Sequence, residues 1–443
     1  MQLKKSQSIK QKLALASSAL LLATPSISAE KKEAKITDVD KIGISQLYYT
    51  EEERVTVNKT QVLINKEINE SNLVKFNYVY DTMSGASPNG RIYSVISDDN
   101  SITYTTASGS ANTVANNSSG EGIEAWKTSF EDTRKAYNAE WEHEFFRTFK
   151  GVVGGGYSTE NDYESKTFSG KFLLDVNQRR TTVTAGMSVS LDTVSPFGGV
   201  PEGSSVLTCH EFAAFRPTWL ECDNIKTIFA PGDKVVKDYL IGVTQVWNRR
   251  TLMQFNFAFS TEDGYLTDPY KQVSLVSSEL DGGELAVLHE KRPDTRNTQS
   301  LFYKVIHVPT DKIGLRGSYR LYWDDWGVIA HTFNSHIRYD LLSKVYVQAH
   351  GRLHWQGAAD FFQPYVGADS DSLYHSSSRP NIISADSRLG ELANITAGIK
   401  LGIKINKDSN ASIRIEKLQT RYDNKLLPQL ETLITQFNLY FKF

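Results

Sequence analysis

Short stretches in which apolar and polar residues alternate recur along almost the whole chain. In the last of them, residues 435–443, polar side chains fall on one side of an extended strand, and on the other fall Phe437, Leu439, Phe441 and Phe443. A soluble edge strand this apolar would invite aggregation, although the carboxy-terminal strand of a soluble sandwich is the alternative interpretation. A strand of a transmembrane barrel needs one apolar face toward lipid and one polar face toward the lumen. The pattern therefore predicts a transmembrane β-barrel.

Sixteen such stretches are found, separated by short turns and long loops in strict alternation. Outer-membrane barrels place short turns on the periplasmic side and long loops outside, and they have even strand numbers. The fold class is therefore all-β, an outer-membrane barrel of about sixteen antiparallel strands, with fourteen or eighteen as alternatives. The predicted strands cover residues 42–50, 55–68, 73–82, 133–148, 152–160, 167–177, 181–193, 236–247, 251–261, 298–308, 313–324, 327–341, 344–356, 393–405, 411–421 and 431–443.

The amino-terminal residues carry the features of an export signal. Four lysines precede a short apolar run, and small residues follow up to Ala29. This order is typical of a cleaved secretory signal peptide, and the run is too short for a membrane-spanning helix. We expect a signal peptide over residues 1–29, a periplasmic lead-in over 30–41, and a single barrel domain over 42–443. The expected location is the outer membrane of a Gram-negative cell, with lipid and the barrel assembly machinery as partners. The apolar carboxy-terminal set ending at Phe443 is the expected assembly signal.

Composition narrows the function classes. The formal net charge is −2 at pH 7, without the basic excess that a nucleic-acid-binding protein normally carries. Aromatic residues make up 11% of the chain, which suits interfacial girdles. In an exported protein, two cysteines most simply form one disulfide, so we expect Cys209 and Cys222 to be bridged. The neighbouring His210 and Glu211 could suggest a metal site, but the disulfide is favoured, and we expect no metal and no cofactor.

Period two also predicts which side chains line the lumen. If apolar residues such as Leu315 and Ile399 face lipid, their neighbours turn inward. The expected basic wall is Arg316, Arg320, Arg338, His350, Arg352, His354, Lys400, Lys404 and Arg414. About half a circumference away, the expected acidic residues are Glu140, Glu142 and Glu144. Opposed walls of unlike charge would set a transverse field across a pore. The alternative is that the basic side chains pair with neighbours such as Asp324 and Glu416, leaving a structural lumen.

Two further features concern turns. The glycines Gly85 and Gly90 predict positive φ angles in a turn-rich loop after residue 82. The run Asp324 to Gly327 predicts a short hairpin turn, with Trp326 at the outer interface. Its paired carboxylates could bind Ca²⁺, although a solvated turn is the simpler interpretation.

Enzymatic interpretations are weak. His331, Ser335 and His336 lie on one predicted strand, with His350 and His354 on the next. No nucleophile with a base and an oxyanion site can be assigned among them. We expect no enzyme, and an outer-membrane hydrolase is the remote alternative.

Four stretches carry a resemblance to a known family: 81–88 (DTMSGASP), 264–271 (GYLTDPYK), 315–327 (LRGSYRLYWDDWG) and 383–389 (ISADSRL). The chain resembles uncharacterised Gram-negative outer-membrane barrels that are defined only as a domain of unknown function. The resemblance implies a barrel in the outer membrane and no known activity. It also suggests a small lipoprotein or a periplasmic flavin-linked protein as a partner. The expected function is a porin-like conduit of unnamed solute, and the alternative is a scaffold barrel that holds such a redox partner.

Overall fold

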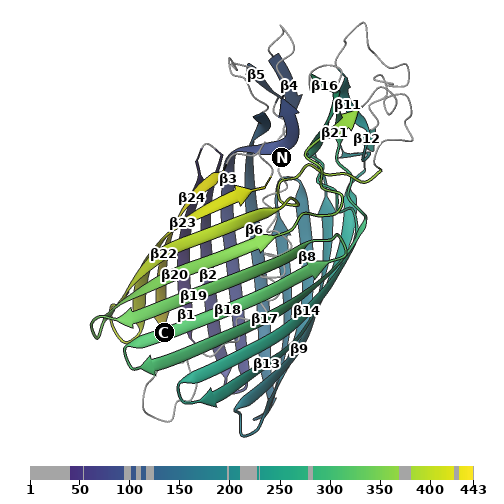
Figure 1. The fold of residues 1–443 in the computed structure, drawn as a ribbon. Coiled ribbons are helices and arrows are strands. Elements are labelled where there is room, and N and C mark those ends of the chain that lie inside the picture. The colour runs from purple at the N-terminus through teal and green to yellow at the C-terminus, as the bar shows by residue number, and fades with distance from the viewer. Residues whose placement is uncertain are drawn as a thin grey trace.

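The computed structural model shows a closed barrel, in which sixteen antiparallel strands of the described residues form the wall (Figure 1). The structure describes residues 40–52, 54–93, 101–105, 111–115, 124–196, 199–209, 227–228, 230–277, 283–368, 381–423 and 429–442. No helix among these residues is long and apolar enough to cross a membrane. The signal peptide expected over residues 1–29 lies outside the described residues, as does most of the lead-in.

Each barrel strand pairs with the next barrel strand along the chain. In order around the wall, the strands are β1 (Lys41–Glu51), β2 (Val55–Asn69), β3 (Asn72–Tyr93), β6 (Glu124–Phe146), β7 (Phe149–Thr159), β8 (Tyr163–Val176), β9 (Thr181–Val194) and β13 (Gly232–Asn248). The wall continues with β14 (Thr251–Gly264), β17 (Thr295–Thr310), β18 (Ile313–Asp324), β19 (Ile329–Asp340), β20 (Val345–Gln356), β22 (Leu392–Lys404), β23 (Ser409–Tyr422) and β24 (Leu430–Lys442).

The two ends of the wall meet in a seam between β1 and β24. Their register runs from Lys41 opposite Lys442 to Glu51 opposite Thr432. On β24 the apolar side chains Phe437 and Phe441 are exposed on the outer face of the barrel. Phe443 lies outside the described residues, so the expected assembly signal stays a prediction.

The remaining strands form small sheets beyond the long-loop end of the barrel (Figure 1). They are β4 (Ser101–Thr105), β5 (Ala111–Ala115), β10 (Val200–Pro201), β11 (Val206–Cys209), β12 (Thr227–Ile228), β15 (Gln272–Ser277), β16 (Gly283–His289) and β21 (Val366–Ala368). Cys222 lies outside the described residues, as do His210, Glu211 and the side chain of Cys209. The predicted disulfide and its metal alternative therefore stay untested.

The polar composition of residues 83–125 predicts a loop, but β3 continues to Tyr93 and β6 begins at Glu124. A strand that extends beyond the lipid zone needs no apolar face, so its composition resembles a loop. The predicted positive φ angles are confirmed, at 128° for Gly85 and 99° for Gly90. The expected turn is wrong, because both glycines lie within β3, and the strand register shifts between Pro88 and Ile92.

Alternate residues of each strand face outward. On β22, the outer side chains Ile395, Ile399 and Leu401 are 49%, 62% and 48% exposed, whereas Thr396 between them is buried. The exposure alternates because successive side chains of a β-strand point to opposite faces of the sheet.

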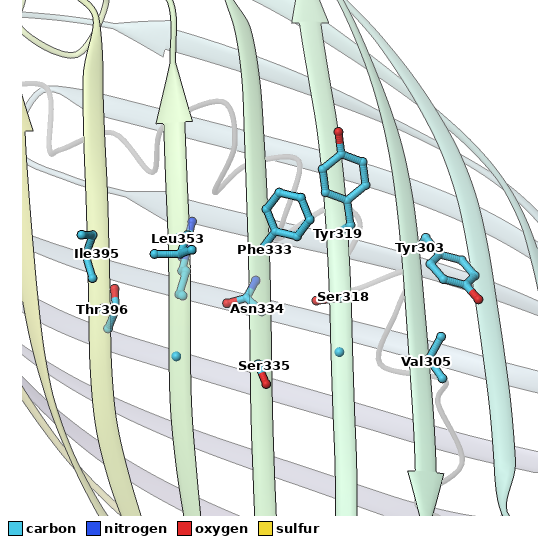
Figure 2. Close-up of a pocket in the computed structure, with 13 residues that line it drawn as sticks. Tyr303, Val305, Ser318, Tyr319, Phe333, Asn334, Ser335, Leu353, Ile395 and Thr396 are labelled. Carbon is cyan, nitrogen blue, oxygen red and sulfur yellow. The ribbon is translucent and has the colours of Figure 1, made fainter.

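The outer face carries a hollow of about 650 Å³ on β17 to β22. Figure 2 shows Tyr303, Phe333, Leu353 and Ile395 around it, and all of them belong to the outward set.

Candidate functional site

A band of basic side chains covers the inner face of strands β17 to β23. In register, Arg316 on β18 lies beside His336 on β19, which lies beside His350 on β20. The next residue along β19, Ile337, is exposed on the outer face, so this row points inward. The same register argument gives the set called here the basic wall: Lys304, Arg316, Arg320, His336, Arg338, His350, Arg352, Lys400 and Arg414.

Few carboxylates neutralise the basic wall. Glu416 is shared, lying 2.6 Å from Nδ1 of His350 and 3.4 Å from Nη1 of Arg414. Arg338 pairs with Asp340 at 2.8 Å. Within the described residues, no ion pair to a carboxylate is formed by Lys304, Arg316, Arg320, Arg352 or Lys400. This side of the interior therefore carries a net positive charge.

The three glutamates on the opposite side are paired with lysines. β6 is the fourth strand of the wall and β19 the twelfth, which places them half a circumference apart. The closest carboxylate–ammonium distances are 3.0 Å from Lys75 to Glu142, 3.3 Å from Lys171 to Glu140 and 3.5 Å from Lys150 to Glu144. Because three ammonium groups accompany three carboxylates, these six residues carry no net charge. The predicted acidic wall is therefore neutralised, whereas the basic wall keeps a positive excess.

The other residues that the sequence analysis named lie either at the two ends of the basic wall or on opposite faces of the same strand. His354 is buried beside Thr332 at the long-loop end, with 2.8 Å between Nδ1 and Oγ1, and Lys404 ends β22 at the short-turn end. His331 and Ser335 lie in the outward set, whereas His336 lies in the inward set. The arrangement therefore does not assemble a serine nucleophile with either histidine. Among the described residues, no three His, Cys, Asp or Glu side chains are close enough to hold a metal ion.

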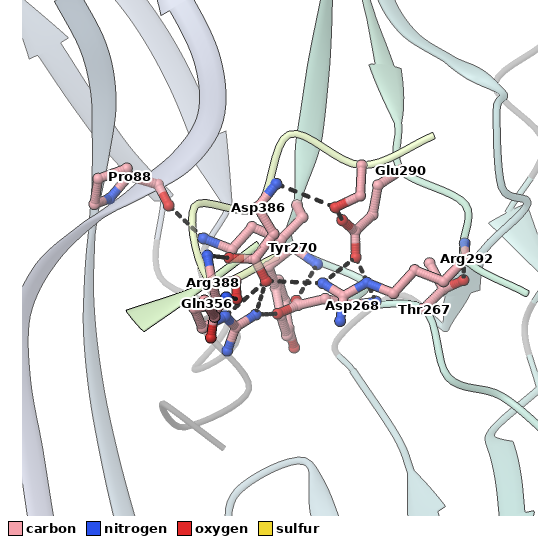
Figure 3. A network of polar contacts seen from close by, with 11 residues as sticks. Pro88, Thr267, Asp268, Tyr270, Glu290, Arg292, Gln356, Asp386 and Arg388 are labelled. Atoms are coloured by element: carbon pink, nitrogen blue, oxygen red, sulfur yellow. Dashed lines mark hydrogen bonds and ion pairs between the residues drawn. The ribbon is translucent and has the colours of Figure 1, made fainter. Parts of the chain in front are cut away.

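A network of six charged side chains, four of them buried and two arginines partly exposed, lies at the long-loop end (Figure 3). This cap network consists of Asp268, Lys271, Glu290, Arg292, Asp386 and Arg388. Arg388 lies 2.7 Å from Asp268 and also binds Asp386, and Arg292 bridges Glu290 at 2.6 Å and Asp386 at 2.8 Å. Lys271 donates a hydrogen bond to the backbone carbonyl of Pro88. Three cations balance three carboxylates, which is the condition for burying charge at tolerable cost.

Burial shifts the proton affinities at this end. Burial raises the pKa of Glu290 to about 7, opposed by the charge of Arg292. Burial also raises the pKa of Asp162, to about 7, although Tyr270 donates a 2.8 Å hydrogen bond to its carboxylate. Asp386 behaves oppositely: burial alone would raise its pKa, but Arg388, Lys271 and Arg292 outweigh that effect and hold it well below the usual range. Glu290 and Asp162 therefore titrate near neutral pH, and Asp386 titrates at far lower pH.

Trp326 lies at the same end of the barrel, and its position shows that the placement expected from the sequence is wrong. Its side chain is buried against Leu266 and Leu389, not placed at the outer interface, and its Nε1 donates to the carbonyl of Thr295. Asp324 ion-pairs with Arg296 and accepts hydrogen bonds from the backbone of Trp326 and Val328. It is neither a solvated turn residue nor a partner of the basic wall. The four stretches that carried the family resemblance thus meet at one end of the barrel.

Two members of the basic wall escaped the sequence prediction. Lys304 lies between Tyr303 and Val305, two residues on the outer face, so period two could have found it. His336 stacks on His350 with ring centroids 4.2 Å apart. Sequence alternation could not have predicted the cap network, because its residues come from loops in which apolar and polar residues do not alternate.

Several solved structures share the barrel architecture at low identity. A bacterial polysaccharide outer membrane secretin is 8% identical, covers 92% of this chain and 99% of its own, and has a TM-score of 0.45. OccK5 (OpdH) of Pseudomonas aeruginosa is 6% identical, with 91% and 98% covered and a TM-score of 0.39. The CymD monoaromatic hydrocarbon channel is 7% identical, with 91% and 88% covered and a TM-score of 0.36.

No curated protein matches the chain. A family model described as "Protein of unknown function (DUF3570)" matches residues 10–441, and the chain therefore belongs to that family.

Proposed function

We propose that the chain is a channel of the Gram-negative outer membrane through which small anionic solutes diffuse. The outward apolar side chains support a place in lipid, because leaving so many exposed to water would be costly. Barrels of sixteen strands are wide enough to leave an aqueous passage between their walls.

The observation that carries the proposal is the shortage of counter-charges on the basic wall within the described residues. A carboxylate partner is lacking there for Lys304, Arg316, Arg320, Arg352 and Lys400, which project from four of five consecutive strands. A solute anion entering the barrel would supply the missing negative charge. Rings or bands of Arg and Lys select anions in this way, and low-dielectric walls strengthen the field.

The paired side makes the preference one-sided. Glu140, Glu142 and Glu144 would attract cations if they were free, but Lys75, Lys150 and Lys171 accompany them. The interior therefore offers anions a favourable wall and offers cations none of comparable strength.

The test is the reversal potential of the purified barrel in a planar bilayer under a salt gradient. Wild type should conduct and prefer chloride over potassium. The triple variant Arg316→Glu, Arg320→Glu, Arg352→Glu should shift selectivity toward cations. A matched control reverses three cations of the outer face, Lys135→Glu, Lys166→Glu and Lys237→Glu, with the same total charge change and no expected shift. An unchanged reversal potential in the folded inner-face variant would show that the basic wall does not govern permeation.

Conductance also separates the channel from the scaffold alternative. A scaffold for a lipoprotein or flavin-linked partner would give no steps as pure protein and would conduct, if at all, after a partner is added. Stable steps from pure protein favour the channel.

A further inference from the structure

The hollow on the outer face follows a row of small residues. Gly317 on β18, Ser335 on β19, Gly351 on β20 and Ala397 on β22 lie opposite one another in register. Larger residues flank this row on the side of the long loops, where they are Tyr319, Phe333, Leu353 and Ile395 (Figure 2). On the other side the row consists of Leu315, Ile337, Ala349 and Ile399. Gly317, Ser335 and Gly351 line the hollow, and Ala397 continues their row onto a fourth strand. The hollow along this row is called here the groove.

The backbone does not require glycine in this groove. A Cβ added to Gly317 or Gly351 would meet no atom within 4 Å. Neither residue has a positive φ angle. A strand glycine lowers stability relative to alanine, because it loses more backbone freedom on folding and has no side chain to pack. What the two glycines provide is the open space itself.

The dimensions of the groove restrict its occupant. Neighbouring strands are about 4.8 Å apart, so four strands give a length of roughly 15–20 Å. The flanking rows are four residues apart along each strand, roughly 13 Å, and their side chains fill much of that width. An α-helix with its side chains is about 10–12 Å across and is too broad. A single extended hydrocarbon chain is narrow enough.

A positive charge stands at one end of the groove. In register, Ala397 lies opposite Lys417 on β23, whose side chain is 58% exposed on the outer face. Arg421 is exposed on the same face, four residues nearer the long-loop end. Lys417 pairs with the exposed Glu431 at 2.6 Å, and such surface pairs rearrange at little cost. Within the described residues, Arg421 forms no ion pair with a carboxylate.

From Lys417 toward β17, the row of small residues runs away from the long-loop end of the barrel and into its apolar outer zone. Ala397 lies five residues from the long-loop end of β22 at Leu392, whereas Val305, in the same row, lies ten residues from the corresponding end of β17 at Thr295. An amphiphile in the groove would place an anionic head at Lys417 and its tail along the glycines.

We propose that this groove binds an acyl chain of phosphorylated lipid A, with a phosphate beside Lys417 and Arg421. Lipid A is the anionic amphiphile of the leaflet into which the long-loop end would project. The inference rests on the outer-membrane location proposed above, but not on conduction.

The experiment fills the groove without touching the interior. In the double variant Gly317→Leu, Gly351→Leu, the added side chains occupy the floor. Lipid A that remains bound after purification in mild detergent is quantified by mass spectrometry, per mole of folded barrel. It should fall several-fold. The matched control, Gly155→Leu with Gly170→Leu, adds the same two side chains on the outer face of β7 and β8, away from the groove, and should retain wild-type lipid A.

A second variant, Lys417→Glu, leaves the groove open and should also lower lipid A several-fold. If both variants retain wild-type lipid A, the proposal is wrong. Loss of phospholipid in place of lipid A, or a change of oligomeric state with lipid A unchanged, would assign the groove to another occupant and overturn it as well. The reversal potential of the filled variant should equal that of wild type, so a failure of the channel proposal is distinguishable from a failure here.

Discussion

Arg388 and Asp268 are 120 positions apart in the sequence, and their side chains form an ion pair of 2.7 Å in which the carboxylate is buried and the guanidinium partly exposed. The same guanidinium binds Asp386, and Arg292 links Asp386 to Glu290. The segment after β14 is thereby fastened to the segments before β17 and before β22. The buried carboxylates at the long-loop end depend on these arginines, so the stability of this end depends on every partner being present.

Removing Arg388 should open this end while leaving the barrel closed. In Arg388→Met, Asp268 and Asp386 lose their principal buried partner, and breaking a buried pair in this way costs about 3–5 kcal/mol. Proteases should cleave residues 264–294 and 383–390 much faster, with the barrel strands still protected. Arg421→Met, at an exposed position, is the control and should behave as wild type. Equal protection in both variants would contradict a structural role for the cap network.

The stability of the long-loop end should fall as the pH rises from about 4.5 to 7. Asp162 and Glu290 have folded pKa values of about 7, above the ordinary 3.8 and 4.5, so the folded state retains protons that the open state releases. Asp386 has the opposite shift, and its contribution is lost only below about pH 4. Protease cleavage of residues 264–294 and 383–390 should be slower at pH 5.5 than at pH 8. The rates are divided by the rate on an unstructured peptide at the same pH, and each pKa unit by which a carboxyl is shifted within this range should change the ratio about tenfold.

The double variant Asp162→Asn, Glu290→Gln should flatten this pH dependence, because neither group can then release a proton. A wild-type profile that is flat or rises with pH would refute the assignment.

Gly85 should be the glycine least tolerant of substitution in β3. Its φ of 128° is a conformation that L side chains avoid, and an added Cβ would lie 1.9 Å from the carbonyl oxygen of Arg54. We expect Gly85→Ala to lower stability by about 1–3 kcal/mol. The readout is the temperature at which the folded band changes mobility in a heat-modifiability gel. Gly357→Ala is the control, because an added Cβ there meets nothing within 4 Å.

Deleting Phe443 should block assembly and leave export intact, because the apolar carboxy-terminal set is the predicted assembly signal. The deleted protein should accumulate in the periplasm or be degraded there, as followed by fractionation. Phe443→Trp keeps an aromatic terminus and should assemble normally. Normal insertion of the deletion variant would exclude this residue from the signal.

Alternation predicted the barrel well because its cause is local. A strand between lipid and water must place apolar residues at every second position, whatever its partner is, so β18 was predicted with the bounds Ile313–Asp324 that the structure shows. The inward positions of Arg316 and Lys400 follow from the same rule.

Long-range pairing left no comparable trace. That Lys171 would accompany Glu140 depends on the register of β6, β7 and β8, which spacing alone does not determine. Trp326 lies in a turn without period, so nothing in the alternation indicated that its ring would stack against Arg296, 4.1 Å away, inside the barrel. Strands β15 and β16 were missed because they pair outside the wall.

The seam between β1 and β24 joins Ser45 to Gln436 through a 2.7 Å side-chain hydrogen bond across 391 positions. Every other strand pairing of the wall joins two strands that follow one another in the wall, but this one joins the first strand to the last. A barrel interrupted at any earlier strand would therefore present two unpaired edges at once, at β1 and at its last completed strand. Closing the wall therefore requires the last strand to be present. The open edges disappear together when β24 pairs with β1, and a shorter barrel would keep edges that can pair with a neighbouring chain.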